Sequence, residues 1–151
     1  MFSFRTTAID EQLDKSLTAG RVGCFCTQNC WDTAKGRYLW DLFAERGVLE
    51  TVFSPRDTEL TPLTNHIEFD RESLAGLTTV VVEIQDTGSR WFNYTRDVFT
   101  LMNMLRDMEC EAPSLYIVDH INPAGRIVEG TMPSGECEDF LPKIAHRHGL
   151  T

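Results

Sequence analysis

The sequence predicts an α/β protein, a three-layer sandwich in which helices cover both faces of a mostly parallel sheet of about four or five strands. Three observations lead to this class. Four apolar segments of strand length occur along the chain, helical patterns alternate with them, and each apolar segment ends in a group of polar residues. Because crossovers between parallel strands are right-handed, the helices are expected on the two faces of the sheet.

The amino-terminal part of the chain is expected to contain the first two strands. Residues 1–19 form an extension with a short acidic helix over residues 10–18. Arg21–Thr27 is predicted as the first buried strand, and Val48–Ser54 as the second. The helix between them is predicted over residues 33–46, with Gly47 as its stop. Its apolar residues are spaced i, i+3 and i+4: Leu39, Leu42 and Phe43.

The next part of the chain supplies the other two strands. A short helix is predicted to begin at the N-cap Asp70 and to end at Gly76. Thr78–Ile84 is predicted as the central buried strand, and Ser114–Val118 as a fourth buried strand. The clearest helix is predicted between them, over Trp91–Met108. Its apolar stripe consists of Tyr94, Val98, Leu101, Met102, Leu105 and Met108.

Length and charge restrict the class of protein further. The chain, residues 1–151, is predicted to be one domain, because this length buries about 68–70% of the unfolded surface. A net charge of −9 without a basic run argues against nucleic-acid binding. No segment approaches the roughly 20 apolar residues of a membrane span. Residues 1–5 are not followed by a signal-like apolar core, so a cytoplasmic protein is expected.

The five cysteines are odd in number and do not have the spacing of a disulfide framework, so reduced thiols are expected. The close spacing of Cys24, Cys26 and Cys30 suggests a metal site, but Cys24 and Cys26 fall in an apolar strand, where cysteine acts as a small hydrophobic residue. Paired metal-binding clusters such as CxxC…CxxC do not occur. His146 and His148 are two residues apart, which by itself is a weak signal. No metal site is therefore predicted.

Polar residues at the carboxyl ends of the four predicted strands should lie along one edge of the sheet, where α/β proteins bind ligands. These residues are Asn29; Arg56, Asp57 and Glu59; Gln85, Asp86 and Arg90; and Asp119, His120 and Asn122, with Glu129 nearby. Two carboxylates in such a cleft can catalyse glycoside hydrolysis. The GxGxxG, GxxxxGK[ST] and GxSxG motifs are absent, so neither a nucleotide cofactor nor a nucleophilic serine is predicted.

Each of these residues also has a purely structural interpretation. Asn29 suits an ordinary turn. Asp86 and Asp119 could each cap a helix. Arg90 could bind a ligand anion or pair with Asp86.

Five segments follow one another along the chain: GCFCTQN (23–29), VFSP (52–55), VVVEIQDTGSRWFNY (80–94), IVDHINPAGRIVEG (117–130) and HRHGLT (146–151). In this order they resemble the signature blocks of the exo-β-N-acetylmuramidase family of peptidoglycan hexosaminidases, formerly a domain of unknown function. The resemblance covers residues 20–151 and only the amino-terminal, Rossmann-like half of that family. The carboxyl-terminal domain is therefore expected to be absent.

The resemblance implies a bacterial hydrolase of cell wall turnover. Such a glycosidase removes N-acetylmuramic acid (MurNAc) from the non-reducing end of peptidoglycan fragments without a cofactor, and many family members act outside the cytoplasm. Glu129 and Asp86 are implied as catalytic residues. The residues implied in substrate binding are Asn29, Arg90, Tyr94, Asp119, Asn122 and His148.

One departure from the family lies after the second strand, where the family typically reads Pro-Glu-His-Gly and this chain reads Pro55-Arg56-Asp57-Thr58. Arg56 replaces an expected catalytic glutamate and cannot transfer a proton near neutral pH, which leaves Asp57 and Glu59 as substitutes. Weak or absent hydrolysis by the chain alone is expected. A non-catalytic carbohydrate-binding or regulatory domain, and one half of a split enzyme with a partner chain, remain as alternatives. An unpaired domain face would also favour homo-oligomers.

Overall fold

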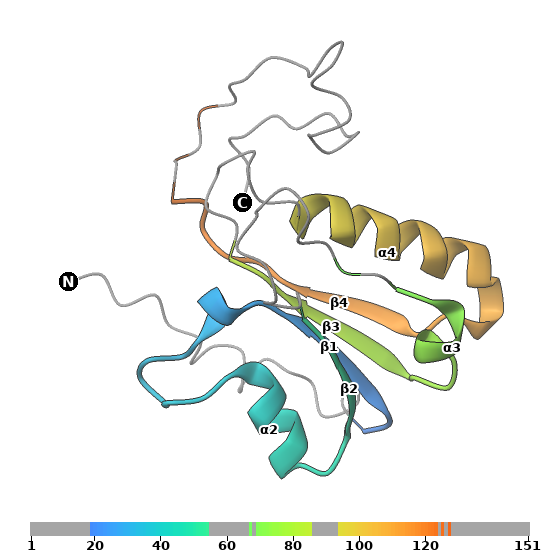
Figure 1. Cartoon of the computed structure of the whole chain (residues 1–151), viewed down its shortest axis with the longest axis horizontal. Coiled ribbons are helices and arrows are strands. Elements are labelled where there is room, and N and C mark those ends of the chain that lie inside the picture. The colour runs from blue at the N-terminus through green and yellow to red at the C-terminus, as the bar shows by residue number, and fades with distance from the viewer. Residues whose placement is uncertain are drawn as a thin grey trace.

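The computed structural model describes residues 19–54, 67, 69–85, 94–123, 125 and 127. In this part of the chain, four strands form one sheet in the order β2-β1-β3-β4, and every neighbouring pair is parallel (Figure 1). The strands are β1 (Val22–Cys26), β2 (Leu49–Phe53), β3 (Thr79–Glu83) and β4 (Ser114–Val118). The predicted α/β class is confirmed. The helix predicted over residues 10–18 lies outside the described residues.

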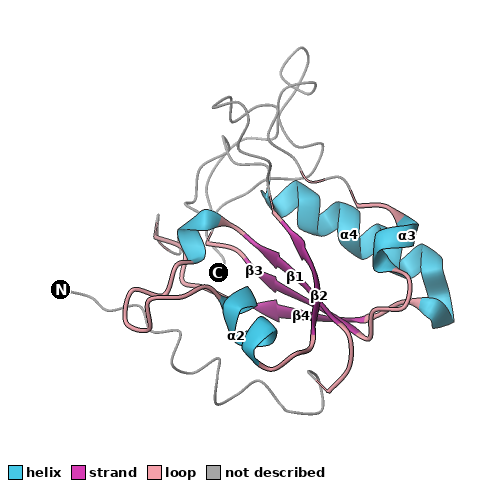
Figure 2. Cartoon of the chain, turned by 60° about the horizontal axis from the view of Figure 1, so that its bottom comes forward, coloured by secondary structure: helices cyan, strands magenta, loops and turns pink. Residues whose placement is uncertain are grey.

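Helices lie on both faces of the sheet. The helix α2 (Leu39–Glu45) covers one face, whereas α3 (Arg71–Leu74) and α4 (Tyr94–Met108) cover the other (Figure 1). Figure 2 shows the strands as a single layer between α2 and α4. Two 3-10 turns, η1 (Gln28–Cys30) and η2 (Glu109–Glu111), follow β1 and α4. This is the predicted Rossmann-like, three-layer arrangement.

The core consists of two apolar clusters, one on each face of the sheet. Every residue of the central strands β1 and β3 is buried. Because side chains alternate along a strand, Cys24 and Cys26 belong to the cluster under α2, and Phe25 belongs to the cluster under α4. The same alternation in β3 places Val81 under α2 and Val82 under α4.

The start of α2 differs from the prediction. The helix begins at Leu39 instead of residue 33, because residues 32–37 form a turn. The carboxylate of Asp32 accepts hydrogen bonds from the backbone N–H groups of Ala34 (2.9 Å) and Lys35 (3.2 Å). Gly36 has a φ of +65°, which a continuous α-helix does not allow. A side chain that bonds to nearby backbone competes with helix formation, and here it delays the helix by about two turns.

Two further predictions about burial were wrong. β4 was predicted to be buried, but it lies at one end of the strand order, and its Ile117 is 48% exposed. Met102 was placed on the buried stripe of α4, but it is exposed. Asp97 is buried on this helix instead, and its carboxylate accepts a hydrogen bond from the backbone N–H of Ile67 (3.2 Å). The spacing of apolar residues therefore could not predict that a polar residue, Asp97, is buried on this helix.

The short helix α3 begins as predicted. A carboxylate oxygen of its N-cap, Asp70, accepts a hydrogen bond from the backbone N–H of Ser73 (2.7 Å).

Replacing this N-cap by alanine, Asp70→Ala, is expected to lower the free energy of unfolding by about 0.5–2 kcal/mol, because the bonded N–H group of the first turn loses its acceptor. Chemical denaturation followed by circular dichroism measures the difference. Asp70→Asn keeps an oxygen acceptor and serves as the matched control. Equal losses in both variants would contradict a capping role.

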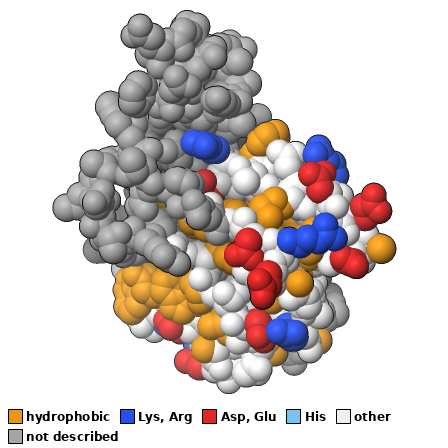
Figure 3. Space-filling view, turned by 45° about the vertical axis from the view of Figure 1, so that its right-hand side comes forward, with side chains coloured by type: hydrophobic (Ala, Val, Ile, Leu, Met, Phe, Trp, Pro, Cys, Tyr) orange, Lys and Arg blue, Asp and Glu red, His pale blue; other side chains and the backbone are white. Residues whose placement is uncertain are grey.

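The exposed surface carries charges of both signs. Figure 3 shows acidic and basic side chains interspersed over the described part of one face. Exposed ion pairs of this kind include Arg71 with Glu111 (2.9 Å) and Arg106 with Asp107 (2.9 Å). Such pairs contribute little to stability. In the part of the chain that the structure describes, no helix is both long and apolar enough to cross a membrane.

Candidate functional site

The order of the strands determines where a ligand is expected. The chain passes from β1 to β2 on the α2 face, and from β2 to β3 on the opposite face, so its direction of winding reverses between β1 and β3. Open α/β sheets bind ligands outside the carboxyl ends of the strands at this reversal, the topological switch point. The last residues of the two strands, Cys26 and Glu83, are register partners there.

Glu83 is the unexpected residue at the switch point. It ends an otherwise apolar strand and is only 1% exposed. Strand alternation places its side chain on the α2 face, like that of Val81 two residues earlier. A buried carboxylate is costly unless other groups compensate its charge.

The neighbours of Glu83 come from two segments of the chain, the one at the end of β1 and the one after β4. His120, in the segment after β4, places its Nε2 3.3 Å from Oε1 of Glu83. The Sγ of Cys26 lies 3.9 Å from Oε2, and the Sγ of Cys30 lies 3.2 Å from the backbone oxygen of Glu83. We refer to Cys26, Cys30, Glu83 and His120 as the switch-point cluster.

The turn η1 brings the second thiol to this cluster. The backbone N–H of Cys30 donates to the backbone oxygen of Thr27 (3.0 Å), so the chain turns back immediately after β1. The hydroxyl of Thr27 also lies 3.4 Å from the Sγ of Cys30. As a result, the side chains of Cys26 and Cys30 face the same buried volume.

Electrostatic interactions in the cluster favour a cationic imidazole and neutral thiols. The hydrogen bond with Glu83 raises the pKa of His120 above its ordinary value, and partial burial opposes this only in part. The pKa of the Cys26 thiol is raised mainly by its contact with Cys24, and that of Cys30 mainly by its contact with Cys26. Burial raises both thiol pKa values further.

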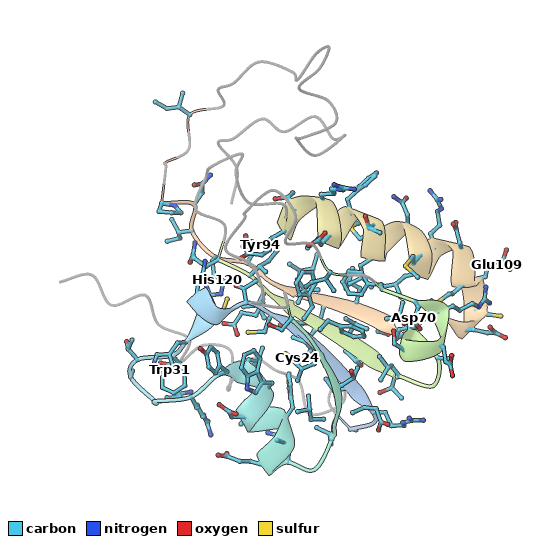
Figure 4. All side chains as sticks on the ribbon, viewed as in Figure 1. Cys24, Trp31, Asp70, Tyr94, Glu109 and His120 are labelled. Atoms are coloured by element: carbon cyan, nitrogen blue, oxygen red, sulfur yellow. The ribbon has the colours of Figure 1, made fainter. Side chains whose placement is uncertain are left out.

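Besides His120 and Gln85, four of the predicted site residues lie in the described part of the chain. Tyr94 and Asn122 are almost completely buried, and Asn29 and Asp119 are exposed. Asn29 is in η1, Tyr94 begins α4, and the other two follow β4. Figure 4 shows Tyr94 and His120 at the same end of the sheet. Asn29, Asp119 and Asn122 thus follow the carboxyl ends of β1 and β4, as predicted, and Tyr94 lies at the start of α4.

The loops after β3 and β4 are joined by a hydrogen bond. The amide of Gln85 donates to the backbone oxygen of Ile121 (3.2 Å). The other residues of the predicted site lie outside the described residues: Arg56, Asp57, Glu59, Asp86, Arg90, Glu129 and His148.

Sequence reasoning overlooked most of the switch-point cluster. His120 was among the polar residues at strand ends, but Glu83 was treated as part of a strand, and Cys26 as a hydrophobic residue. One signal was present in the sequence. Glu83 is the only charged residue in the segment TVVVE, and it falls at the carboxyl end of this segment. Because side chains alternate along a strand, it lies on the same face as Val81, two residues earlier. Cys26 and Glu83 then become neighbours only through the pairing of β1 with β3.

The fold and this edge define the protein as a doubly wound α/β domain with a polar, partly buried switch point. A search of curated proteins and a search of solved structures gave no match. The family model described as exo-beta-N-acetylmuramidase NamZ, N-terminal, matches residues 63–151, more than half of the chain. The chain therefore belongs to this family and represents its amino-terminal domain. The predicted family membership is confirmed.

Proposed function

We propose that this domain supplies the sugar-binding edge of a peptidoglycan exo-β-N-acetylmuramidase, a glycoside hydrolase that acts on MurNAc at the non-reducing end. The observation that carries the proposal is the family match over residues 63–151. This range contains β3, β4 and the segments at their carboxyl ends, beside the point where the sheet reverses its winding. Ligands of open α/β sheets bind at such a point.

In this proposal, Glu129 and Asp86 are the catalytic carboxylates, because glycoside hydrolysis commonly uses one carboxyl group as acid and another as base or nucleophile. Side chains that contact the sugar surround them. These are Asn29, Arg90, Tyr94, Asp119, Asn122 and His148. The family match includes all of these positions except Asn29.

A second function, carbohydrate binding without efficient hydrolysis, is favoured by Arg56. This residue stands where the resemblance implies a glutamate, and the matched range begins only at residue 63. A guanidinium cannot act as a general acid or base near neutral pH, so a contribution of about 10²–10⁴ to the rate would be missing. We therefore expect the isolated chain to bind MurNAc but to hydrolyse a MurNAc glycoside only slowly.

A chromogenic MurNAc glycoside and free MurNAc test the two functions separately. Glu129→Gln is expected to lower the residual release of the chromophore by about 10² or more. Glu109→Gln is the matched control, because Glu109 is an exposed residue beyond the far end of α4 (Figure 4), and it should change neither hydrolysis nor binding.

Calorimetric titration with MurNAc provides the second measurement. If Glu129→Gln changed neither chromophore release nor MurNAc affinity, the assignment of Glu129 would be wrong. Efficient turnover by the unmodified chain would contradict the binding-only function. An absence of MurNAc binding together with an absence of turnover would contradict both.

A further inference from the structure

We propose that the switch-point cluster is a binding site for a transition metal ion, with Zn²⁺ as the ion that its ligands suit best. The four ligands are the sulfur atoms of Cys26 and Cys30, a carboxylate oxygen of Glu83 and Nε2 of His120. This site is independent of the proposed glycosidase function, which uses no metal.

The distances within the cluster carry the proposal. The ligand atoms of Cys26, Cys30 and Glu83 all lie within 4.8 Å of one another. In a tetrahedral zinc site, bonds of about 2.0–2.3 Å place neighbouring ligand atoms roughly 3.3–3.8 Å apart. The 3.9 Å between Sγ of Cys26 and Oε2 of Glu83 and the 3.3 Å between Nε2 of His120 and Oε1 of Glu83 are close to these values. The other three ligands already form a group, and His120, which adjoins this group through Glu83, would have to move toward the two sulfur atoms to complete the coordination.

The chemistry of the ligands selects the metal. Two thiolates, an imidazole and a carboxylate form a mixed set of sulfur, nitrogen and oxygen ligands, which suits Zn²⁺ and does not suit Mg²⁺ or Ca²⁺. Binding would release the protons that the two thiols carry in the metal-free protein, and it would also displace the proton on Nε2 of His120, because only a neutral imidazole nitrogen coordinates a metal.

The position of the cluster indicates a structural site. Cys26, Cys30 and Glu83 are buried, and the side chain of His120 is 20% exposed. Four protein ligands leave no open position for water or substrate, which is typical of structural zinc. The ion would connect β1, η1, β3 and the segment after β4, and it should stabilise the folded state because it binds this state preferentially.

Titration of the full chain with Co²⁺, a spectroscopic substitute for Zn²⁺, tests the site. The protein is stripped of metal with a chelator, kept reduced so that Cys26 and Cys30 cannot form a disulfide, and then freed of the chelator. We expect a sulfur-to-cobalt charge-transfer band and intense visible bands of tetrahedral Co²⁺, saturating at an equimolar amount. Added Zn²⁺ should abolish these bands and raise the melting temperature.

Single substitutions identify the ligands. Cys30→Ser leaves Cys26 as the one thiolate ligand, so it is expected roughly to halve the charge-transfer band at saturation and to weaken metal affinity by at least about 100-fold, since even losses outside the ligand shell cost 10–100-fold. His120→Ala should weaken binding while both thiolates remain. Circular dichroism of the metal-free variants shows whether each still folds.

Matched cysteine variants complete the test. Neither Cys110, which is exposed, nor Cys137 is a proposed ligand, so Cys110→Ser and Cys137→Ser should each bind Co²⁺ like the unmodified chain. Loss of the bands in either variant would overturn the proposed ligand set. An absence of thiolate bands in the reduced, unmodified protein would overturn the site itself, whatever the variants do.

Discussion

His120→Ala is expected to lower the free energy of unfolding of the metal-free protein by about 3 kcal/mol. The substitution leaves the carboxylate of Glu83 buried without its cationic partner. We expect the lower end of the range for breaking a buried ion pair, because the His120 side chain is 20% exposed and Glu83 is 1% exposed. Urea denaturation in the presence of a chelator measures this loss without any contribution from metal.

Two comparisons test whether the loss belongs to the pair. Arg71→Ala removes an exposed ion pair with Glu111 and should cost no more than about 1 kcal/mol. In the double variant His120→Ala with Glu83→Gln, the two losses should not add, because Glu83→Gln removes the charge that His120→Ala leaves buried. Additive losses would show that the two side chains do not stabilise each other.

Phe25→Ala is expected to be the most destabilising single change in the apolar core, by about 3–5 kcal/mol. Phe25 is fully buried in the central strand β1, on the face covered by α4. Its ring also contacts Phe69, with ring centroids 5.5 Å apart. A cavity at this place cannot collapse easily, because sheet and helices hold its walls on both sides. Urea denaturation gives the difference in unfolding free energy.

Phe99→Ala provides the matched control for the aromatic deletion. Phe99 lies on α4 but is 51% exposed, so its removal should change the unfolding free energy by no more than about 1 kcal/mol. Similar losses for Phe25 and Phe99 would mean that burial does not determine the cost, contrary to the core described above.

The elements of the fold could be predicted from the sequence because their signals are local. The bounds of β4 agree with the prediction, and the N-cap of α3 is Asp70 as expected. The start of α2 could not be predicted from apolar spacing, because the turn at Asp32 depends on hydrogen bonds between a side chain and the backbone. The exposure of β4 depends on the order of the strands, which no local pattern contains.

The candidate site was only partly accessible to the same reasoning. Polar residues that follow an apolar strand are easy to recognise in a sequence. The structure places Asn29, Asp119 and Asn122 after β1 and β4, as predicted. Glu83 was overlooked, since a charged residue at a strand end is usually expected to face water. Its burial results from its neighbours in the sheet, and the register that joins it to Cys26 is a long-range property.

The switch-point cluster combines groups that are far apart in the chain. Cys26 and Glu83 are separated by 57 residues, and Glu83 and His120 by 37. Bringing together groups that are so far apart in the chain costs conformational entropy. Strand pairing offsets this cost. All four groups therefore meet only after β1, β3 and β4 have aligned. The environment of the two thiols, which are close to each other in sequence, therefore depends on the assembly of three of the four strands.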